Sequence, residues 1–262
     1  MENSAENKDF DVSLVIPTYN ESLTIETLIA EVAASFVKTG ASIEFVVVDD
    51  DSPDGTAQKA ESLKNEYDVK VIVRKKERGL ATAVVRGFKE ASGGLLAVID
   101  GDMQHPPDTI THLYLDMKEH GADMAVASRK VAGGGTKDWE FHRLIISETA
   151  TLIAKFMLPL SLFKIRDATT GCFMFKRECV DFSKLSPSGF KIFLEVLVKG
   201  RFAKKVEIPF LFNQRSLGKS KLTFKQNIIF IYHLIRLGLA SGEIAVPAGI
   251  AALIAALVFM FF

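Results

Sequence analysis

The sequence predicts an α/β protein built on a doubly wound, mostly parallel sheet with helices on both faces. Over the first hundred residues, short runs rich in Val, Ile and Leu alternate with segments whose apolar residues recur at helical spacing. Polar clusters follow the apolar runs directly, and in sheets of this kind ligands bind at the carboxyl ends of the strands. With 262 residues, 48% of them hydrophobic, the chain can bury a large core.

Each expected element has its own signal. Strands are expected at 12–17, 43–48, 69–73, 95–99 and 122–128, where short, mostly apolar runs are bounded by polar or turn residues. Helices are expected at 23–37, 56–66, 81–91 and 143–158, where apolar residues keep the spacing of one helix face. Asn20 or Ser22 is a candidate cap for the first of these helices.

Four polar clusters are expected to meet at one edge of this sheet. They lie at 18–21, at 49–54, at Arg78 and at 100–105. In the last cluster, Asp100 and Asp102 share one face of extended backbone, and Gly101 between them lets the chain turn. Oxygen ligands of this kind favour Mg²⁺ or Mn²⁺ over zinc. Taken alone, an Asp-Gly pair after a strand is also ordinary turn chemistry.

Several classes of protein are disfavoured. No glycine-rich fingerprint follows the first strand, which argues against a dehydrogenase or an ATPase. Cys172 and Cys179 are the only cysteines and have no partners at zinc spacing, so both are expected to be buried thiols rather than parts of a disulfide framework. The acidic N-terminus has no apolar stretch of the signal-peptide type, and the first part of the chain is therefore expected to stay in the cytosol.

The C-terminal part has the signature of a membrane protein. The formal net charge is zero, yet residues 1–66 carry 14 acidic and 4 basic side chains and residues 199–236 carry 9 basic and 1 acidic. An apolar stripe at helical spacing predicts an amphipathic helix at the membrane interface; it consists of Phe224, Ile228, Tyr232, Ile235 and Leu239. The uncharged run 244–262 is long enough for a transmembrane segment, with a buried core helix as the alternative. Three parts are therefore expected: a cytosolic catalytic domain at 1–222, an interface helix at 223–242 and a transmembrane segment at 243–262.

The second half of the expected catalytic domain carries two further candidate features. The glycines at 133–135 form a candidate lid, or simply a surface linker, and the single tryptophan, Trp139, follows them. Arg143 and Ser147 are four residues apart and hence on one helix face. A guanidinium and a hydroxyl so placed can hold a phosphate, although an ordinary solvated pair has the same spacing.

Four motifs together resemble the inverting glycosyltransferases of family 2, which have the Rossmann-like GT-A fold. They lie at 15–21, 47–56, 78–83 and 100–106. Within that family, Ser-Pro-Asp-Gly-Thr at 52–56 and Asp-x-Asp-x-Gln-His-Pro at 100–106 resemble the polyprenyl-phosphate glycosyltransferases, above all the dolichol-phosphate mannose synthases. Thr170-Gly171 stands where many relatives have Ser-Gly, and Asp167, which is a candidate for recognising a sugar hydroxyl, lacks the proline that often follows it.

The resemblance implies a role for each matching residue. Donor nucleotide contacts are implied for Pro17, Tyr19, Glu21, Val48, Asp49, Asp51, Arg78, Asp100 and Gln104. Ligands of Mg²⁺ or Mn²⁺ are implied for Asp100, Asp102 and Gln104. Contacts to the acceptor phosphate are implied for Arg129, Arg143, Ser147, Arg215 and Lys221. The residues expected to act in catalysis are Asp102, Arg129 and Arg215.

The resemblance also implies a reaction, namely metal-dependent inverting transfer of mannose from GDP-mannose to dolichyl or another polyprenyl phosphate at the cytosolic membrane face. A phosphate monoester is already largely dianionic at neutral pH, so the acceptor needs no catalytic base. Three alternatives remain open: a polyprenyl-phosphate glucosyltransferase using UDP-glucose, a nucleotidyltransferase, and a catalytically silent membrane subunit that only binds a nucleotide sugar. The expected partners are the nucleotide sugar, the polyprenyl phosphate and the lipid bilayer, and no nucleic acid is expected.

Overall fold

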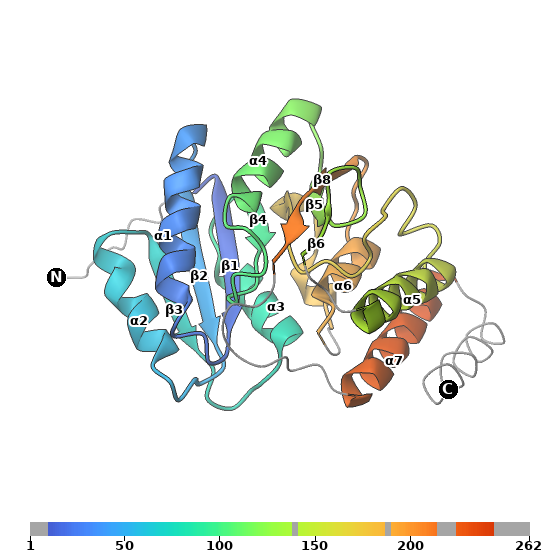
Figure 1. Ribbon diagram of the computed structural model, residues 1–262, viewed down its shortest axis with the longest axis horizontal. Helices are drawn as coiled ribbons and strands as arrows, with labels where there is room; N and C mark the ends of the chain where they lie inside the picture. Colours follow the sequence, from blue (N-terminus) through green and yellow to red (C-terminus); the bar gives the residue numbers. More distant parts are fainter. Residues whose placement is uncertain (1–9, 138–140, 187–189, 214–223, 244–262) are drawn as a thin grey trace.

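Seven strands form one sheet in the computed structural model, which describes residues 10–137, 141–186, 190–213 and 224–243 (Figure 1). Their order is β3-β2-β1-β4-β7-β5-β8. The strands are β1 (Val12–Thr18), β2 (Ile43–Asp49), β3 (Val69–Val73), β4 (Leu95–Val98), β5 (Met124–Ser128), β7 (Phe173–Lys176) and β8 (Lys205–Pro209). Only β7 runs antiparallel to its neighbours β4 and β5, while the other described pairs are parallel. The prediction of a mostly parallel sheet is confirmed.

Helices cover both faces of this sheet (Figure 1). They are α1 (Ile25–Phe36), α2 (Thr56–Ser62), α3 (Leu80–Glu90), α4 (Thr109–His120), α5 (Phe141–Met157), α6 (Ile192–Lys199) and α7 (Phe224–Ser241). Side chains alternate between the two faces of a strand, so Leu14 and Ile16 of β1 belong to the apolar cluster that includes residues of α1 and α4, whereas Val15 belongs to the cluster that includes residues of α3, α5, α6 and α7. The doubly wound arrangement is thus set by alternating apolar residues.

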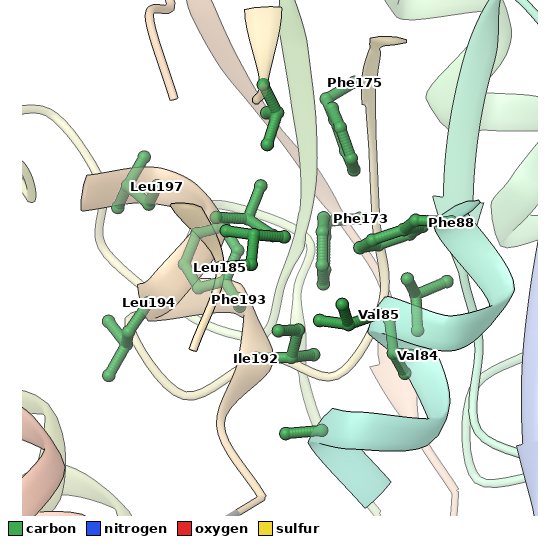
Figure 2. Close-up of a cluster of buried hydrophobic side chains, with 14 of the residues drawn as sticks. Val84, Val85, Phe88, Phe173, Phe175, Leu185, Ile192, Phe193, Leu194 and Leu197 are labelled. Atoms are coloured by element: carbon green, nitrogen blue, oxygen red, sulfur yellow. The ribbon is translucent and has the colours of Figure 1, made fainter. Parts of the chain in front are cut away.

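Aromatic side chains fix the reversed strand β7 in the core. Phe88 of α3 meets Phe175 edge-on, with ring centroids 5.2 Å apart, and Phe173 lies 5.3 Å from Phe193 of α6 (Figure 2). Aromatic pairs in such arrangements stabilise a core beyond the area they bury. Because β7 is reversed, it begins at the edge where its neighbours end, and the residues just before it join the loops there.

Two local expectations are wrong. The residue before α1 is Thr24, not Asn20 or Ser22, and its Oγ1 donates 2.7 Å to the carbonyl of Gly101 instead of capping the helix. The glycines at 133–135 do not form a free lid, because Gly135 begins the short strand β6 (Gly135–Thr136), which pairs with β9 (Leu211–Phe212).

Helix α7 is amphipathic, as predicted, and packs against α5 and α6. Phe230, Ile231, Leu234 and Leu237 are buried, while Ile228, Tyr232 and Leu239 of the predicted stripe are exposed. None of the helices in the described part of the chain has the length and apolar character needed to cross a membrane. The predicted transmembrane segment lies almost wholly at 244–262, outside the described residues.

A buried carboxylate joins α6 to α7. Glu195 accepts hydrogen bonds from His233 Nε2 at 2.7 Å and from the backbone N–H of Ser186 at 2.9 Å, and it also pairs with Lys199 and Arg236. Burial by itself would raise the pKa of Glu195, but the hydrogen bonds from His233 and Lys199 outweigh it and lower the pKa to about 2. A carboxylate can only accept, so His233 Nε2 carries the proton in this pair.

We expect Glu195→Gln to lower the free energy of unfolding by about 3 kcal/mol at pH 7, because it removes the buried carboxylate that accepts from His233 and pairs with Lys199 and Arg236. Since the pKa of Glu195 is lowered from 4.5 to about 2, the stabilisation is complete above pH 4.5 and is lost as the pH falls towards 2. Thermal melting of the full chain in detergent across this range measures it, with the exposed Glu178→Gln as control. An equal penalty at pH 7 and pH 2.5 would contradict this assignment.

Candidate active site

The carboxyl ends of the parallel strands bring the predicted polar clusters to one edge of the sheet. Thr18 at the end of β1 lies opposite Asp49 at the end of β2 in the hydrogen-bonded register, and Ser128 of β5 lies opposite Pro209 of β8. The loop after β4, which begins with Ile99 and Asp100, emerges beside β1. The convergence expected from the sequence is therefore present in the fold.

Three of the expected donor contacts lie in or directly at the ends of the strands. Pro17 and Val48 are buried register partners in β1 and β2. Asp49 is fully buried, and its carboxylate accepts from Thr18 Oγ1 at 2.9 Å and from the N–H and Oγ of Ser52 at 2.8 and 2.6 Å. These hydrogen bonds fix the loop after β2, and exposed Asp51 lies within it.

Three further donor-side residues, Tyr19, Glu21 and Arg78, are partly or fully exposed at the same edge. The guanidinium of Arg78 lies 5.1 Å from the ring centroid of Tyr19, with Arg78 Nη1 3.5 Å from the phenol oxygen. The N–H of Glu21 donates to Thr56 Oγ1 at 2.9 Å. A Cβ placed on Gly101 would meet the side chains of Thr18 and Glu21 at 3.3 and 3.4 Å, so the donor loop packs directly on the loop that carries the two aspartates.

The loop that carries Asp100 and Asp102 is hydrogen-bonded to Asn213, the residue that follows β9. The N–H of Gln104 donates to Asp102 Oδ1 at 3.1 Å. Gln104 Nε2 donates to the carbonyl of Asn213 at 3.2 Å, and the Asn213 N–H returns a hydrogen bond of 2.9 Å to the Gln104 carbonyl. With its nitrogen so engaged, the carboxamide of Gln104 has its oxygen as the remaining ligand atom beside Asp102.

The donor set at this loop fits a hard divalent cation. Asp102 and Gln104 are almost completely buried, and both offer oxygen. No group of three or more His, Cys, Asp or Glu side chains in the described ranges could hold a metal ion, and the candidate ligands at this loop are two aspartates and the Gln104 amide. Carboxylate and amide oxygens are ligands suited to Mg²⁺ and Mn²⁺.

Gly171 makes room for Asp100. A Cβ on this residue would lie 2.6 Å from Asp100 Oδ2 and 3.4 Å from His105 Cε1. We expect Gly171→Ala to displace the Asp100 carboxylate and to weaken Mn²⁺ binding at least about tenfold, as loss of supporting contacts around metal ligands does. Calorimetric Mn²⁺ titration measures this. Gly94→Ala is the matched control, because its Cβ would meet nothing closer than 3.9 Å, and equal Mn²⁺ affinity in both variants would refute the argument.

Arg129 is held by Asp167 at the same edge. Arg129 Nε and Nη2 each donate 2.7 Å to one oxygen of Asp167, and Nη2 also donates 2.7 Å to Thr169 Oγ1. Burial by itself would raise the pKa of Asp167, but Arg129 holds that pKa well below its usual range. Asp167 is fully buried, so the expectation that it recognises a sugar hydroxyl is wrong. It orients Arg129 instead.

Sequence reasoning gave no role to two further residues of this edge. Lys191, the residue before α6, donates from Nζ to the carbonyl of Thr169 at 2.6 Å, and burial, aided by the charge of Arg129, lowers its pKa to about 8. His105 is buried with neither ring nitrogen hydrogen-bonded within the described structure, and it stacks on Phe210 at 5.0 Å. Burial lowers the pKa of His105 to about 4. A lysine at a helix N-terminus opposes the helix dipole, which is the signal that could have singled out Lys191.

The predicted acceptor residues are only partly described. Arg143 and Ser147 both lie in α5, four residues apart as expected, and Ser147 is partly buried. Arg215 and Lys221 lie outside the described residues, as does the side chain of Arg143.

The mostly parallel α/β sheet is consistent with a glycosyltransferase of the GT-A type. The chain belongs to glycosyl transferase family 2, whose model matches residues 13–182. It is 45% identical over 89% of its length to the dolichol-phosphate mannosyltransferase of Pyrococcus furiosus and spans 65% of that relative's length. It is 34% identical to the dolichol-phosphate mannosyltransferase of Saccharomyces cerevisiae, over 86% of this chain and 85% of the yeast protein.

A solved structure supports the fold assignment. The glucosyl-3-phosphoglycerate synthase of Mycobacterium tuberculosis, in complex with Mn²⁺, uridine diphosphate and glucosyl-3-phosphoglycerate, superposes with a TM-score of 0.61 at 18% identity. The match covers 90% of this chain and 81% of that one. The family predicted from the sequence motifs, and the relationship to dolichol-phosphate mannosyltransferases within it, are confirmed.

Proposed function

We propose that this chain transfers mannose from GDP-mannose to dolichyl or another polyprenyl phosphate, with inversion at the anomeric carbon. The observation that carries the proposal is the 45% identity, over 89% of the chain, to a dolichol-phosphate mannosyltransferase. The site at the sheet edge is compatible with it, because the loops after β1, β2 and β4 bring donor-side residues and oxygen ligands together. The donor nucleotide contacts are assigned to the residues predicted from the sequence: Pro17, Tyr19, Glu21, Val48, Asp49, Asp51, Arg78, Asp100 and Gln104.

The donor diphosphate is bound with a divalent cation. Asp100, Asp102 and Gln104 would hold Mg²⁺ or Mn²⁺, and the bound cation would neutralise the charge that builds up on the departing nucleotide. The Mn²⁺ in the structure of the mycobacterial synthase supports this choice of metal class. The two aspartates then act as ligands, not as acids or bases.

The acceptor phosphate is held by basic residues from the second half of the chain. Arg129, Arg143, Ser147, Arg215 and Lys221 are assigned to it, and Arg129 is already oriented by Asp167. Asp167 is paired with Arg129, and burial lowers the pKa of His105 to about 4, so both groups are weak bases at neutral pH. A dianionic phosphate needs no general base, and the remaining work is positioning and charge stabilisation.

An exposed apolar surface supports contact with a bilayer. Leu152, Phe156, Leu160 and Phe163, in and just after α5, are each at least 65% exposed, and α7 with its exposed residues lies beside α5 (Figure 1). Contiguous exposed apolar side chains mark interaction sites. The Glu243 carboxylate accepts from the N–H groups of Leu160 and Ser161 at 2.7 and 3.0 Å, so the residue before the uncharged run 244–262 is tied to this surface.

We therefore assign 1–222 to the catalytic domain, 223–242 to an interface helix and 243–262 to a transmembrane segment. The catalytic domain faces the cytosol, in keeping with the basic residues that precede the apolar run.

We expect Phe156→Asp with Phe163→Asp to slow transfer in proteoliposomes about tenfold, since burial of two phenyl groups is worth several kcal/mol. The same variant is expected to retain its rate on a short polyprenyl phosphate in detergent, where no bilayer has to be reached. Leu23→Asp, at an exposed leucine next to α1, is the control. An equal loss of rate in both media would argue against a membrane-facing surface.

We expect Asp102→Ala to abolish transfer while the chain stays folded, because a metal ligand is lost. Arg143→Ala should instead raise the KM for the acceptor roughly tenfold and leave donor binding unchanged, as expected for a charged hydrogen bond to phosphate. Labelled GDP-mannose and a short polyprenyl phosphate in detergent provide the assay. Asp108→Ala, at the exposed residue before α4, is the matched control, and unchanged transfer in the first two variants would overturn the roles.

Calorimetry with GDP-mannose and UDP-glucose, with and without Mn²⁺, tests the donor directly. Tighter binding of UDP-glucose would replace the proposal by the glucosyltransferase. Binding of a nucleotide sugar without turnover on any polyprenyl phosphate would replace it by a silent subunit.

A further inference from the structure

A buried ion pair closes the loop between β3 and α3. Arg74 follows β3 directly and donates from Nε to Asp50 Oδ1 at 2.7 Å, and its Nη2 contacts the same oxygen. Both side chains are almost completely buried. Replacing a buried ion pair with apolar residues is often neutral for stability. Stability alone therefore does not explain why Asp50 and Arg74 are paired here.

The hydrogen bonds of this ion pair converge on the backbone of Gly79. Its N–H donates to Asp50 Oδ2 at 2.8 Å, and its carbonyl accepts from Arg74 Nη2 at 2.9 Å. Arg74 Nη1 reaches Thr82 Oγ1 at 2.9 Å, and that hydroxyl in turn donates to the Gly79 carbonyl. Gly79 has φ +139, a conformation that favours glycine. The ion pair therefore holds both backbone polar groups of this residue.

The residue fixed in this way directly follows Arg78, whose guanidinium lies over the Tyr19 ring. The pair is also bonded to both donor loops: the Asp50 N–H donates to the Thr18 carbonyl at 3.0 Å, and the Arg74 N–H donates to the Asp49 carbonyl at 2.8 Å. Arg78 itself is exposed. An exposed arginine loses conformational entropy when a ligand orders it, and a backbone held in advance removes the backbone part of that cost.

We infer that Asp50 and Arg74 are positioning residues of the donor site: through Gly79 they hold Arg78 over Tyr19, so that the two planar groups form a preorganised contact for a nucleoside diphosphate. Preorganisation of this kind increases affinity without adding contacts. The inference rests on the donor site of the proposed function and does not depend on which sugar is transferred. The competing explanation is that the pair only caps the start of α3, which would affect stability and not nucleotide affinity.

Calorimetric binding of GDP to the full chain in detergent, with Mn²⁺ present, tests the inference. Arg74→Lys keeps the charge but cannot make the same set of hydrogen bonds, and we expect it to weaken GDP binding about tenfold. Arg177→Lys is the matched control, because Arg177 also holds backbone carbonyls, those of Gly93 and Ala91 at 2.8 and 2.7 Å, near the other end of α3. It should leave GDP affinity unchanged. Thr82→Val, at an exposed site, is a milder second variant with a smaller loss in the same direction.

A double-mutant cycle separates positioning from capping. If Arg74 acts through Arg78, then Arg74→Lys should cost nothing further in an Arg78→Ala background. Losses that add, or a lowered melting temperature with unchanged GDP affinity, would overturn the inference while leaving the proposed function intact. A parent chain that binds UDP in place of GDP would refute the proposed donor, and the same cycle run with UDP would then decide the inference. A parent chain that binds neither nucleotide would overturn both.

Discussion

The hydrogen-bonded register of β1 with its two neighbours, β2 and β4, is the constraint on which the site depends. It sets Thr18 opposite Asp49 and brings the loop after β4 to the same edge. Side-chain bonds then join the loops: Thr18 Oγ1 donates to Asp49, and Thr24 Oγ1 donates to the Gly101 carbonyl. A slip of one residue in the register would exchange the two faces of the strand, so the two apolar cores protect the geometry of the edge.

Three buried carboxylates each accept hydrogen bonds from a basic or imidazole side chain of another segment and so connect two parts of the fold. Asp50 holds Arg74 and the loop before α3, Asp167 holds Arg129, and Glu195 holds α7 through His233. The hydrogen bonds and cations around Asp167 and Glu195 lower the pKa values of these two carboxyl groups, which makes both poorly suited to proton transfer. The arrangement favours a reaction in which charges are positioned and protons need not move, as expected for a phosphate acceptor.

The sequence was sufficient for the parallel half of the sheet, because apolar runs and the polar clusters after them have a local signal. It could not reveal that β7 is reversed, since the alternation in Phe173–Lys176 reads the same for either strand direction. The pairing of Asp167 with Arg129, 38 residues away in the chain, leaves no local pattern, so the sequence alone leaves Asp167 a candidate for the sugar. The sequence predicts that Asp49 contacts the nucleoside. It does not reveal that Thr18 and Ser52 donate hydrogen bonds to the Asp49 carboxylate, which only the tertiary structure shows. The contact of Lys191 Nζ with the Thr169 carbonyl spans 22 residues, so the sequence does not reveal this partner either.

Helix α6 links the two environments that the proposed reaction requires. Its first residue follows Lys191, whose ammonium lies among the charges of Arg129, Asp100 and Asp167 at the sheet edge. One turn later, Glu195 holds α7, which carries exposed apolar residues. Because α6 is short and its Phe193 packs against β7, a displacement of α7 relative to the sheet would break either the buried ion pair or the core. Helix α6 therefore connects the charged sheet edge to the exposed apolar residues of α7 within one packed core, which is the arrangement that the proposed reaction needs.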